Sequence, residues 1–261
     1  MKKLFKGLRG GLAFESTLKV GADDQDFPSF VERTYLYPVV GVLLGALLGL
    51  VGVGFSYLPG FIGAALGLVG YYLVGGVIHS DGLADFADAL VAGGGREERR
   101  KVMKDEKTGV AGLVGVMVVN LLLFSALVEL FSAGEPVTVF LIILSGEVLS
   151  KEVMLALLYF GRSPHEGLAS TFMEKVNSTD FWLGTGLMAV VLVAFRAGPA
   201  FLSLLVGVVV VLLLVWLGDR VIGGVNGDIA GAGGEIARPL GMVLLISLWH
   251  FGLLEPAWWG F

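Results

Sequence analysis

Long apolar runs separated by short polar segments dominate the chain from residue 35 onwards. A transmembrane helix needs about 20 apolar residues to cross about 30 Å of hydrocarbon, and these runs reach or approach that length. The pattern therefore predicts an all-α polytopic bundle of about seven transmembrane helices, with residues 1–261 forming a single integral membrane domain. The expected spans cover residues 35–57, 61–78, 110–131, 137–160, 181–195, 201–217 and 239–254.

Polar segments carry nearly all of the basic residues. The N-terminal arm 1–33 and the segments 79–109, 161–181 and 218–238 together hold 16 of the 18 Lys and Arg residues, whereas the opposite side of the predicted bundle has Arg196 alone. Cytoplasmic loops of membrane proteins are rich in Lys and Arg, so the arm and all three segments are expected in the cytoplasm. An amphipathic stretch of the arm is expected either to lie along the membrane interface or to act only as a basic flank.

Composition agrees with this interpretation. Hydrophobic residues make up 56% of the chain and charged residues only 16%, whereas soluble domains carry about 25% charged residues. The chain has no cysteine, which excludes disulfides and thiolate metal ligands. Its first 30 residues lack the pattern of a cleavable signal. We expect membrane lipid as a partner and no nucleic acid, while the sequence leaves the oligomeric state open.

Segment 79–109 opens with three carboxylates at helical spacing, Asp81, Asp85 and Asp88. At about 100° per residue they lie within a sector of about 60° on one helix face. Like charges on one stripe repel each other unless a cation lies between them, and Mg²⁺ prefers oxygen ligands. The stripe therefore predicts a Mg²⁺ site, and the alternative is an ordinary solvated helix face. His79, just before it, is a candidate base, ligand or interfacial residue.

A glycine-rich stretch at 223–235 supplies two further carboxylates, Asp228 and Glu235, which would share one face of a helix. Its glycines allow a backbone to approach a ligand closely and to offer N–H groups to phosphate. Because this stretch is predicted on the same membrane face as the stripe, two carboxylate clusters could hold two metal ions for phosphoryl transfer. The alternative is a flexible glycine-rich loop.

The run 96–107 is dense in Arg and Lys, which would suit a phosphate-rich substrate. Most such runs are only solvated loops that set topology, and Lys104 and Asp105 are the strongest exceptions here. In the segment 161–181, Arg162 and His165 are weaker candidates for the same site.

These motifs, in their order, resemble the cobalamin synthase family, the adenosylcobinamide-GDP ribazoletransferases. The resemblance is carried by His79-x-Asp81-Gly82-Leu83-Ala84-Asp85-x-x-Asp88, by Met103-Lys104-Asp105 with Thr108-Gly109, and by Gly227-Asp228-x-x-Gly231-Ala232-x-x-Glu235. Asn226 stands where the family typically has Thr, and Lys151 where Arg is expected. The likeness covers nearly the whole chain.

The resemblance implies a Mg²⁺-dependent transferase of a prokaryotic plasma membrane, with its active site on the cytoplasmic face. It would join adenosylcobinamide-GDP to α-ribazole or its 5′-phosphate, giving adenosylcobalamin or its 5′-phosphate with release of GMP. The expected metal ligands are Asp81, Asp85, Asp88, Asp228 and Glu235, and all of these except Asp88 are also expected to be catalytic. Substrate contacts are expected at His79, Arg99, Lys104, Asp105, Asn226, Gly227 and Gly231.

Two other classes compete with this interpretation. A CDP-alcohol phosphotransferase-like lipid enzyme would use similar chemistry, but its signature continues Asp-Gly-x-x-Ala-Arg, whereas here Asp81-Gly82-Leu83-Ala84 is followed by Asp85. An ion or metabolite transporter would place carboxylates near the middle of its spans. Here most of the acids lie at one predicted membrane face, and Glu147 and Glu152, with Lys151, fall near the middle of a span.

Overall fold

The computed structural model describes residues 2–133, 135–195 and 198–254, and every element in these ranges is a helix, which confirms the predicted all-α fold. The helices are α1 (Lys2–Glu15), α2 (Asp26–Val31), α3 (Leu36–Phe55), α4 (Gly60–Gly75), α5 (Ile78–Val91), α6 (Arg96–Val102), α7 (Val110–Ala133), α8 (Pro136–Phe160), α9 (Leu168–Met173), α10 (Ser178–Val193), the 3₁₀ turn η1 (Gly198–Phe201), α11 (Leu202–Val221) and α12 (Gly227–His250).

Four of these helices are long and apolar enough to cross a membrane: α3, α7, α11 together with η1, and α12. The helices α4 and α5 pass the same test as one span bent by 97°. The long helix α8 carries three charged residues near its middle, and α10 is shorter. Within the described ranges there are thus four candidate spans, or five with the bent pair. The number of about seven and the cytoplasmic N-terminus stay predictions, and Arg196 lies outside the described residues.

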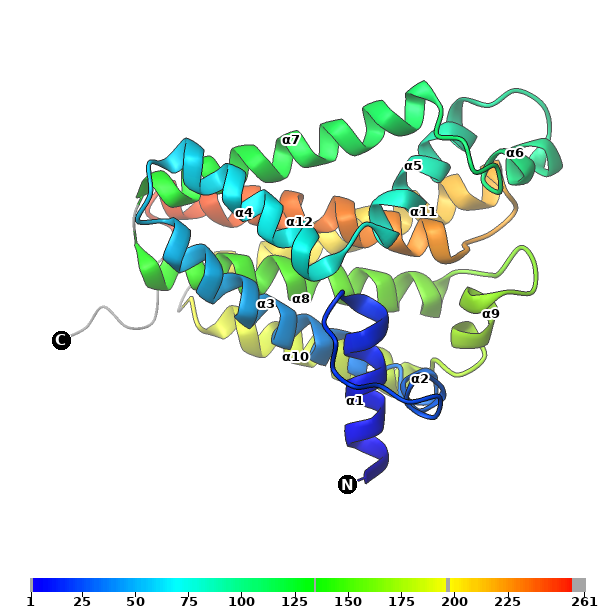
Figure 1. Ribbon diagram of the computed structural model, residues 1–261, viewed down its shortest axis with the longest axis horizontal. Coiled ribbons are helices and arrows are strands. Elements are labelled where there is room, and N and C mark those ends of the chain that lie inside the picture. Colours follow the sequence, from blue (N-terminus) through cyan, green and yellow to red (C-terminus); the bar gives the residue numbers. More distant parts are fainter. Residues whose placement is uncertain (1, 134, 196–197, 255–261) are drawn as a thin grey trace.

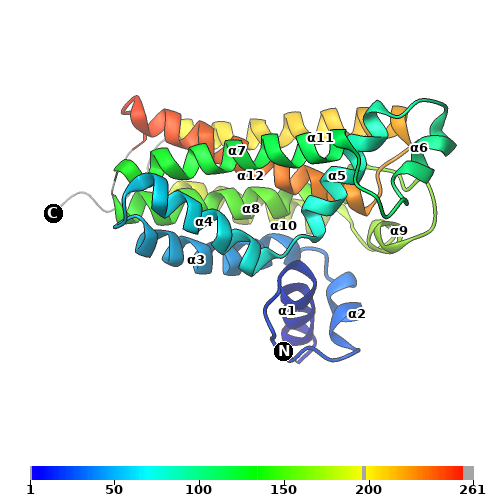
Figure 2. The same cartoon turned by 45° about the horizontal axis from the view of Figure 1, so that its top comes forward.

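The central helix is α8, around which α3, α10, α11 and α12 pack (Figures 1 and 2). Nearly all of its side chains from Thr138 to Leu158 are buried. Helix α3 approaches it along a stripe of glycines, and a Cβ added at Gly45 would lie 3.0 Å from the Leu144 carbonyl oxygen. Small residues at this spacing let membrane helices pack with their backbones close together.

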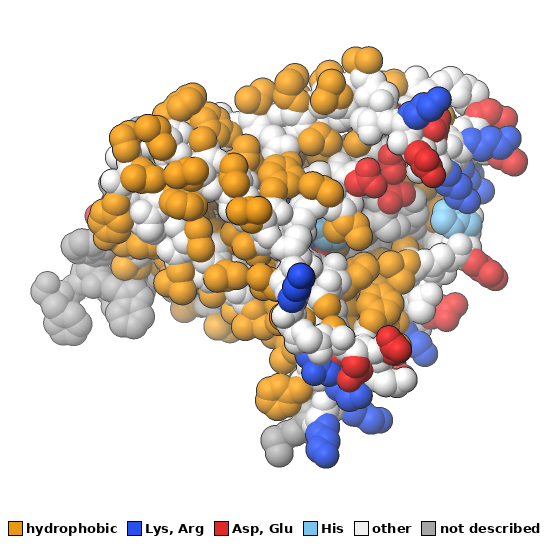
Figure 3. Space-filling model, viewed as in Figure 1, with side chains coloured by type: hydrophobic (Ala, Val, Ile, Leu, Met, Phe, Trp, Pro, Cys, Tyr) orange, Lys and Arg blue, Asp and Glu red, His pale blue; other side chains and the backbone are white. Residues whose placement is uncertain are grey.

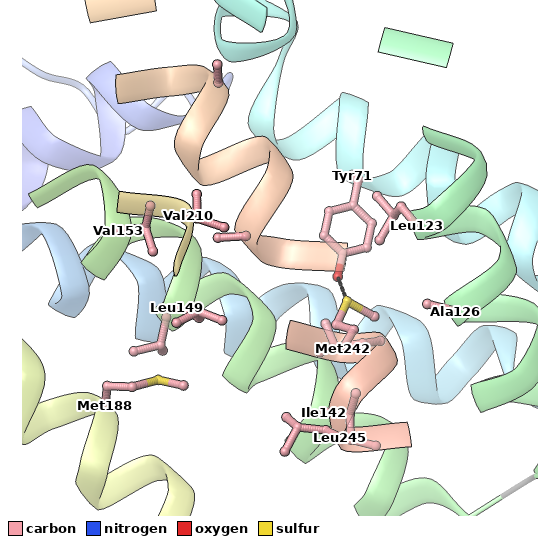
Figure 4. Packing of buried hydrophobic residues seen from close by; sticks show 14 of the residues in the cluster. Tyr71, Leu123, Ala126, Ile142, Leu149, Val153, Met188, Val210, Met242 and Leu245 are labelled. Carbon is pink, nitrogen blue, oxygen red and sulfur yellow. Dashed lines mark hydrogen bonds between the residues drawn. The ribbon is translucent and has the colours of Figure 1, made fainter. Parts of the chain in front are cut away.

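Apolar side chains from the surrounding helices fill the interior (Figure 4). Tyr71 of α4 points toward Met242 of α12, and its hydroxyl lies 3.8 Å from the sulfur. Leu149 of α8, Met188 of α10 and Val210 of α11 belong to the same buried cluster. This core joins the helices that carry the polar segments into one unit.

A sharp bend directs α5 across the end of the bundle. Helix α4 ends because Gly76 has a φ of 72°, a left-handed conformation that favours glycine. Thr17, just after α1, holds the bend: its N–H donates to the Val74 carbonyl at 2.8 Å, and its hydroxyl donates to the Leu73 carbonyl. The N-terminal arm thereby fixes the direction of the helix that carries the acidic stripe.

Helix α12 begins earlier than the sequence predicts. The segment 218–238 was expected to precede a span at 239–254, but α11 continues to Val221 and α12 runs from Gly227 through Pro239 to His250. Asn226 starts this helix, since its side-chain oxygen accepts the N–H of Ile229 at 3.1 Å. The glycines of α12 pack against side chains of α8, such as Ser150 opposite Gly234. The stretch is therefore a packed helix rather than a flexible loop.

Candidate active site

The site lies where α5 crosses the first turns of α12. A Cβ added at Gly82 would lie 2.7 Å from the Cα of Asp228, and one added at Gly231 would lie 2.9 Å from Nδ1 of His79. These distances leave no room for a side chain, so the two glycines allow the helices to touch through their backbones. The crossing brings the acidic stripe of α5 next to the glycine-rich acidic motif of α12. The sequence predicts both segments on the same membrane face, which agrees with this arrangement.

Three carboxylates meet at this crossing. Asp85 experiences the negative charges of Asp81, Asp228 and Asp88, and Asp228 experiences that of Asp81. Asn226 orients Asp228 by donating its side-chain N–H to the carboxylate at 2.7 Å. Such repulsion within a small volume favours a bound cation.

The other two expected metal ligands face different partners. Asp88 accepts hydrogen bonds from the N–H groups of Gly109 at 2.6 Å and Gly112 at 2.8 Å, at the start of α7. Glu235 accepts from Arg238 at 2.8 Å and lines an internal polar cavity. The metal roles of all five carboxylates stay predictions, and the structure brings Asp81, Asp85 and Asp228 to the same helix crossing.

The donor set at the crossing suits Mg²⁺. Among the described residues, no three His, Asp or Glu side chains are placed closely enough to form a ready-made metal site. Mg²⁺ commonly binds through one or two carboxylates and completes its shell with waters and substrate phosphates. Asp81 and Asp85 of α5 fit that requirement and are the residues that would hold the ion, while Asp228 lies across the crossing from them.

A basic helix covers the other side of Asp228. Arg100 of α6 donates from Nε to the carbonyl of Ile222 at 2.7 Å, which fixes α6 on the turn between α11 and α12. A cavity of about 80 Å³ lies here, lined by Arg100, Lys104, His165, Asn226 and Asp228 among others. Figure 3 shows acidic and basic side chains gathered at this end of the molecule, whereas hydrophobic side chains cover the other end.

The sequence identifies this basic cavity only in part. Lys104 lines it as expected, whereas Arg99 does not, and Asp105 accepts the backbone N–H of Lys107 at 3.2 Å. Arg100 was missed, although it lies one helical turn after Arg96 and both pack against Gly223. His165, a weaker candidate, reaches the site because the N–H of Val225 donates to the Arg162 carbonyl at 2.7 Å and holds the two loops together.

A second cavity, of about 260 Å³, also has Asp228 in its lining. Its walls are largely apolar and come from α1, α3, α8, α9 and α12, with Phe14, Tyr37 and Phe172 among them. Its polar end is formed by His79, His165, Asn226 and Asp228, and Gly227 also lines it. Asp228 and Asn226 therefore separate an apolar cavity from a basic one.

Beneath the crossing lies an internal ion network. Glu15, the last residue of α1, is buried 2.6 Å from Nζ of Lys151 and 2.8 Å from Nε2 of His79. Burial alone would raise the pKa of the Glu15 carboxyl, but the charges of Lys151 and His79 outweigh it and lower that pKa. His79 lines both this internal cavity and the apolar one, so the network fixes its ring at the edge of the site.

The helical bundle, with its apolar candidate spans and the carboxylates grouped at its charged end, defines a helical membrane protein. Residues 7–246 match the family model of cobalamin-5-phosphate synthase, and the chain belongs to this family. The chain is thus an enzyme, a transferase of cobalamin biosynthesis.

Several curated relatives carry the name adenosylcobinamide-GDP ribazoletransferase. The protein from Methanocella arvoryzae is 35% identical, with 90% of this chain and 93% of the relative covered. The relative from Halorubrum lacusprofundi is 34% identical over 94% of this chain and 98% of its own length. The one from Archaeoglobus fulgidus is 33% identical over 88% and 92%. No solved structure matches the chain.

Proposed function

We propose that the enzyme joins adenosylcobinamide-GDP to α-ribazole, or to its 5′-phosphate, in a Mg²⁺-dependent reaction. The products would be adenosylcobalamin, or its 5′-phosphate, and GMP. The names of the relatives support the substrates. The observation that carries the mechanism is the position of Asp228, which lines both a basic cavity and an apolar one.

In the proposed step, a ribazole hydroxyl oxygen attacks the phosphorus attached to cobinamide. A new P–O bond forms, the bond from that phosphorus to the oxygen bridging it to GMP breaks, and GMP leaves with the electron pair. Asp228 receives the proton of the hydroxyl, since its carboxylate faces the apolar cavity from which the nucleophile comes. Mg²⁺, when bound, neutralises charge that develops on the diphosphate.

Basic residues would hold the leaving group. Lys104 and Arg100 line the small cavity next to Asp228, where their charges can bind phosphate oxygens of the GDP moiety. Asp81 and Asp85 of α5 would hold Mg²⁺. The clustering of Lys and Arg in the polar segments supports an active site on the cytoplasmic face of a prokaryotic plasma membrane.

The direct test is a GMP-release assay on purified protein in lipid nanodiscs, with adenosylcobinamide-GDP, α-ribazole and Mg²⁺. We expect GMP in the complete mixture, none after removal of Mg²⁺ with EDTA, and recovery when Mg²⁺ is restored. A CDP-activated lipid alcohol serves as the competing substrate. CMP release from that lipid, without GMP release from the corrinoid, would show that this proposal is wrong.

The carboxylate assignments are tested by Asp81→Asn and Asp228→Asn. Each should lower kcat by about 100-fold or more, because one loses a metal ligand and the other the proton acceptor. Asp81→Asn should also need more Mg²⁺ for half-maximal rate. Asp219→Asn is the matched control, since Asp219 is exposed near the end of α11 and lines neither cavity. Near-normal turnover of a folded Asp81→Asn protein would contradict the assignment.

A further inference from the structure

The apolar cavity beside Asp228 is a recess of about 260 Å³ with one polar end. Its far wall combines Met154 and Leu158 of α8 with Phe14 of α1 and Phe172 of α9. Within the described residues, its lining includes no Lys or Arg. A group that carries phosphate charges is therefore unsuited to the recess, whereas an uncharged, largely apolar group fits it.

Aromatic rings form much of the wall. The ring centroids of Phe14 and Phe172 are 6.0 Å apart, and those of Tyr37 and Phe172 are 5.4 Å apart at an interplanar angle of 64°. Aromatic side chains at such angles offer both ring faces and ring edges to a flat ligand. The recess thus favours a planar heteroaromatic ring system over a flexible or globular group.

The volume of the recess shows which part of the two proposed substrates fits into it. Sites that enclose a whole drug-sized ligand have volumes of about 300–1,000 Å³, and this recess lies just below that range. A corrinoid macrocycle is much too large for it, and the guanosine diphosphate moiety carries the wrong charge. A nucleoside with an apolar base has the right size and polarity.

We propose that this recess is the binding site for the base and ribose of α-ribazole. The apolar bicyclic base would lie against the aromatic cluster of Phe14, Tyr37 and Phe172, and the attacking ribose hydroxyl would lie at Asp228. His79 and Asn226, which share the polar end, can hydrogen-bond the other ribose oxygens. This inference rests on the proposed function and assigns one of its two substrates to a defined recess.

The N-terminal arm is part of this site. Phe14 is the residue before Glu15, and Glu15 is anchored to Lys151 of α8 and to His79 of α5. The arm therefore supplies a wall of the nucleoside recess through the same helical turn that ties it to the bundle. The sequence predicts this helix either as an interfacial segment or as a basic flank, and the inference gives it a part in substrate binding as well.

Filling the recess tests the inference. Ala169 of α9 is 6% exposed and lines it, so Ala169→Phe should weaken binding of α-ribazole by tenfold or more, as measured by calorimetry in nanodiscs. In the GMP-release assay, the KM for α-ribazole should rise while the KM for adenosylcobinamide-GDP stays within twofold. Ala156→Phe is the matched control, because Ala156 is equally buried but lines a separate apolar cavity between α8, α10 and α11.

A series of nucleosides tests the wild-type protein, so the inference does not depend on how a variant folds. The base of α-ribazole is a benzimidazole ring that carries two methyl groups. Removing these methyl groups should weaken binding about fourfold for each one, which is the contribution of one buried methyl or methylene group. Equal binding across the series, unchanged binding in a folded Ala169→Phe protein, or no binding of α-ribazole to wild type would overturn the inference. A protein that binds α-ribazole in this way but releases no GMP would overturn the proposed reaction and keep the recess.

Discussion

Lys151 is a buried cation whose partner, Glu15, lies 136 residues earlier in the sequence. Its Nζ lies 2.6 Å from the Glu15 carboxylate, and the two side chains are 2% and 0% exposed. One Glu15 oxygen, Oε1, has no hydrogen-bond partner among the described residues. Because removing one member of a buried pair leaves the other charge uncompensated, the pair contributes strongly to the docking of α1 against α8.

We expect Lys151→Met to lower the free energy of unfolding by about 3–5 kcal/mol, because Glu15 then stays buried without its main partner. The double variant Glu15→Gln/Lys151→Met should recover much of this loss, since neither charge remains. Reversible unfolding by SDS in mixed micelles measures both values. A single variant as stable as wild type would contradict the importance of the pair.

The same carboxylate gives the stability a defined dependence on pH. The pKa of Glu15 is lowered in the folded protein despite burial, because Lys151 and His79 favour its charged form. A carboxyl of this kind stabilises the fold above its unfolded pKa of about 4.3 and loses that contribution as the pH falls through its folded pKa. The stability difference between wild type and Glu15→Gln should therefore be present above about pH 5 and shrink below about pH 4. A difference that grows on acidification would contradict this sign.

At the scale of elements, Asp88 connects α5 to the start of α7. Its carboxylate accepts the N–H groups of Gly109 and Gly112, which are otherwise free at a helix N-terminus. The sequence alone cannot distinguish this use from metal binding, because both need a carboxylate on the same face of α5. The acceptor role becomes visible only when α7 is placed beside α5.

Two variants distinguish the capping role of Asp88 from a role in metal binding. If capping dominates, Asp88→Ala should lower the free energy of unfolding by about 0.5–2 kcal/mol, and Asp88→Asn should need no more Mg²⁺ than wild type for half-maximal rate. Asp85→Asn is the comparison, since Asp85 lies at the crossing with Asp228. An increased Mg²⁺ requirement in Asp88→Asn would instead support a metal ligand.

The crossing of α5 and α12 depends on Gly82. An added methyl group would lie 2.7 Å from the Cα of Asp228, and a backbone atom cannot move aside as a flexible side chain can. We expect Gly82→Ala to cost about 1–3 kcal/mol in stability and to lower turnover at least tenfold by separating the carboxylates. Gly54→Ala, in α3 with open space around it, should leave turnover unchanged. Equal activity of the two variants would show that the close approach is unimportant.

The sequence predicts the helix of the acidic stripe correctly but not the start of α12, and the difference has a physical reason. The helix of the acidic stripe follows from the spacing of Asp81, Asp85 and Asp88, because helical periodicity is a local property. The start of α12 was misplaced, because a glycine-rich stretch has low helix propensity and is stabilised here by packing against α8. Contacts between distant segments, such as Arg100 with Ile222, leave no periodic signal in either segment.

At the scale of the whole molecule, charged side chains gather at one end of the face drawn in Figure 3, whereas hydrophobic side chains cover the opposite end of that face. The carboxylates, the basic helix α6 and the N-terminal arm lie toward this end, whereas the turn between α3 and α4 lies at the opposite end (Figure 1). The distribution of Lys and Arg predicts that the charged end faces the cytoplasm. That orientation would expose the site to GDP-activated and nucleoside substrates on the side where nucleotides are made.

The absence of cysteine makes this orientation directly testable, because any introduced thiol is unique. Lys101→Cys places a thiol on an exposed position of α6, and Tyr57→Cys places one at the α3–α4 turn, where Tyr57 is 75% exposed. In intact cells, a membrane-impermeant maleimide should label Tyr57→Cys and not Lys101→Cys, and permeabilisation should make both reactive. The reverse pattern would place the carboxylates outside the cell, away from the cytoplasmic nucleotide pool, and would contradict the cytoplasmic site and the reaction proposed for it.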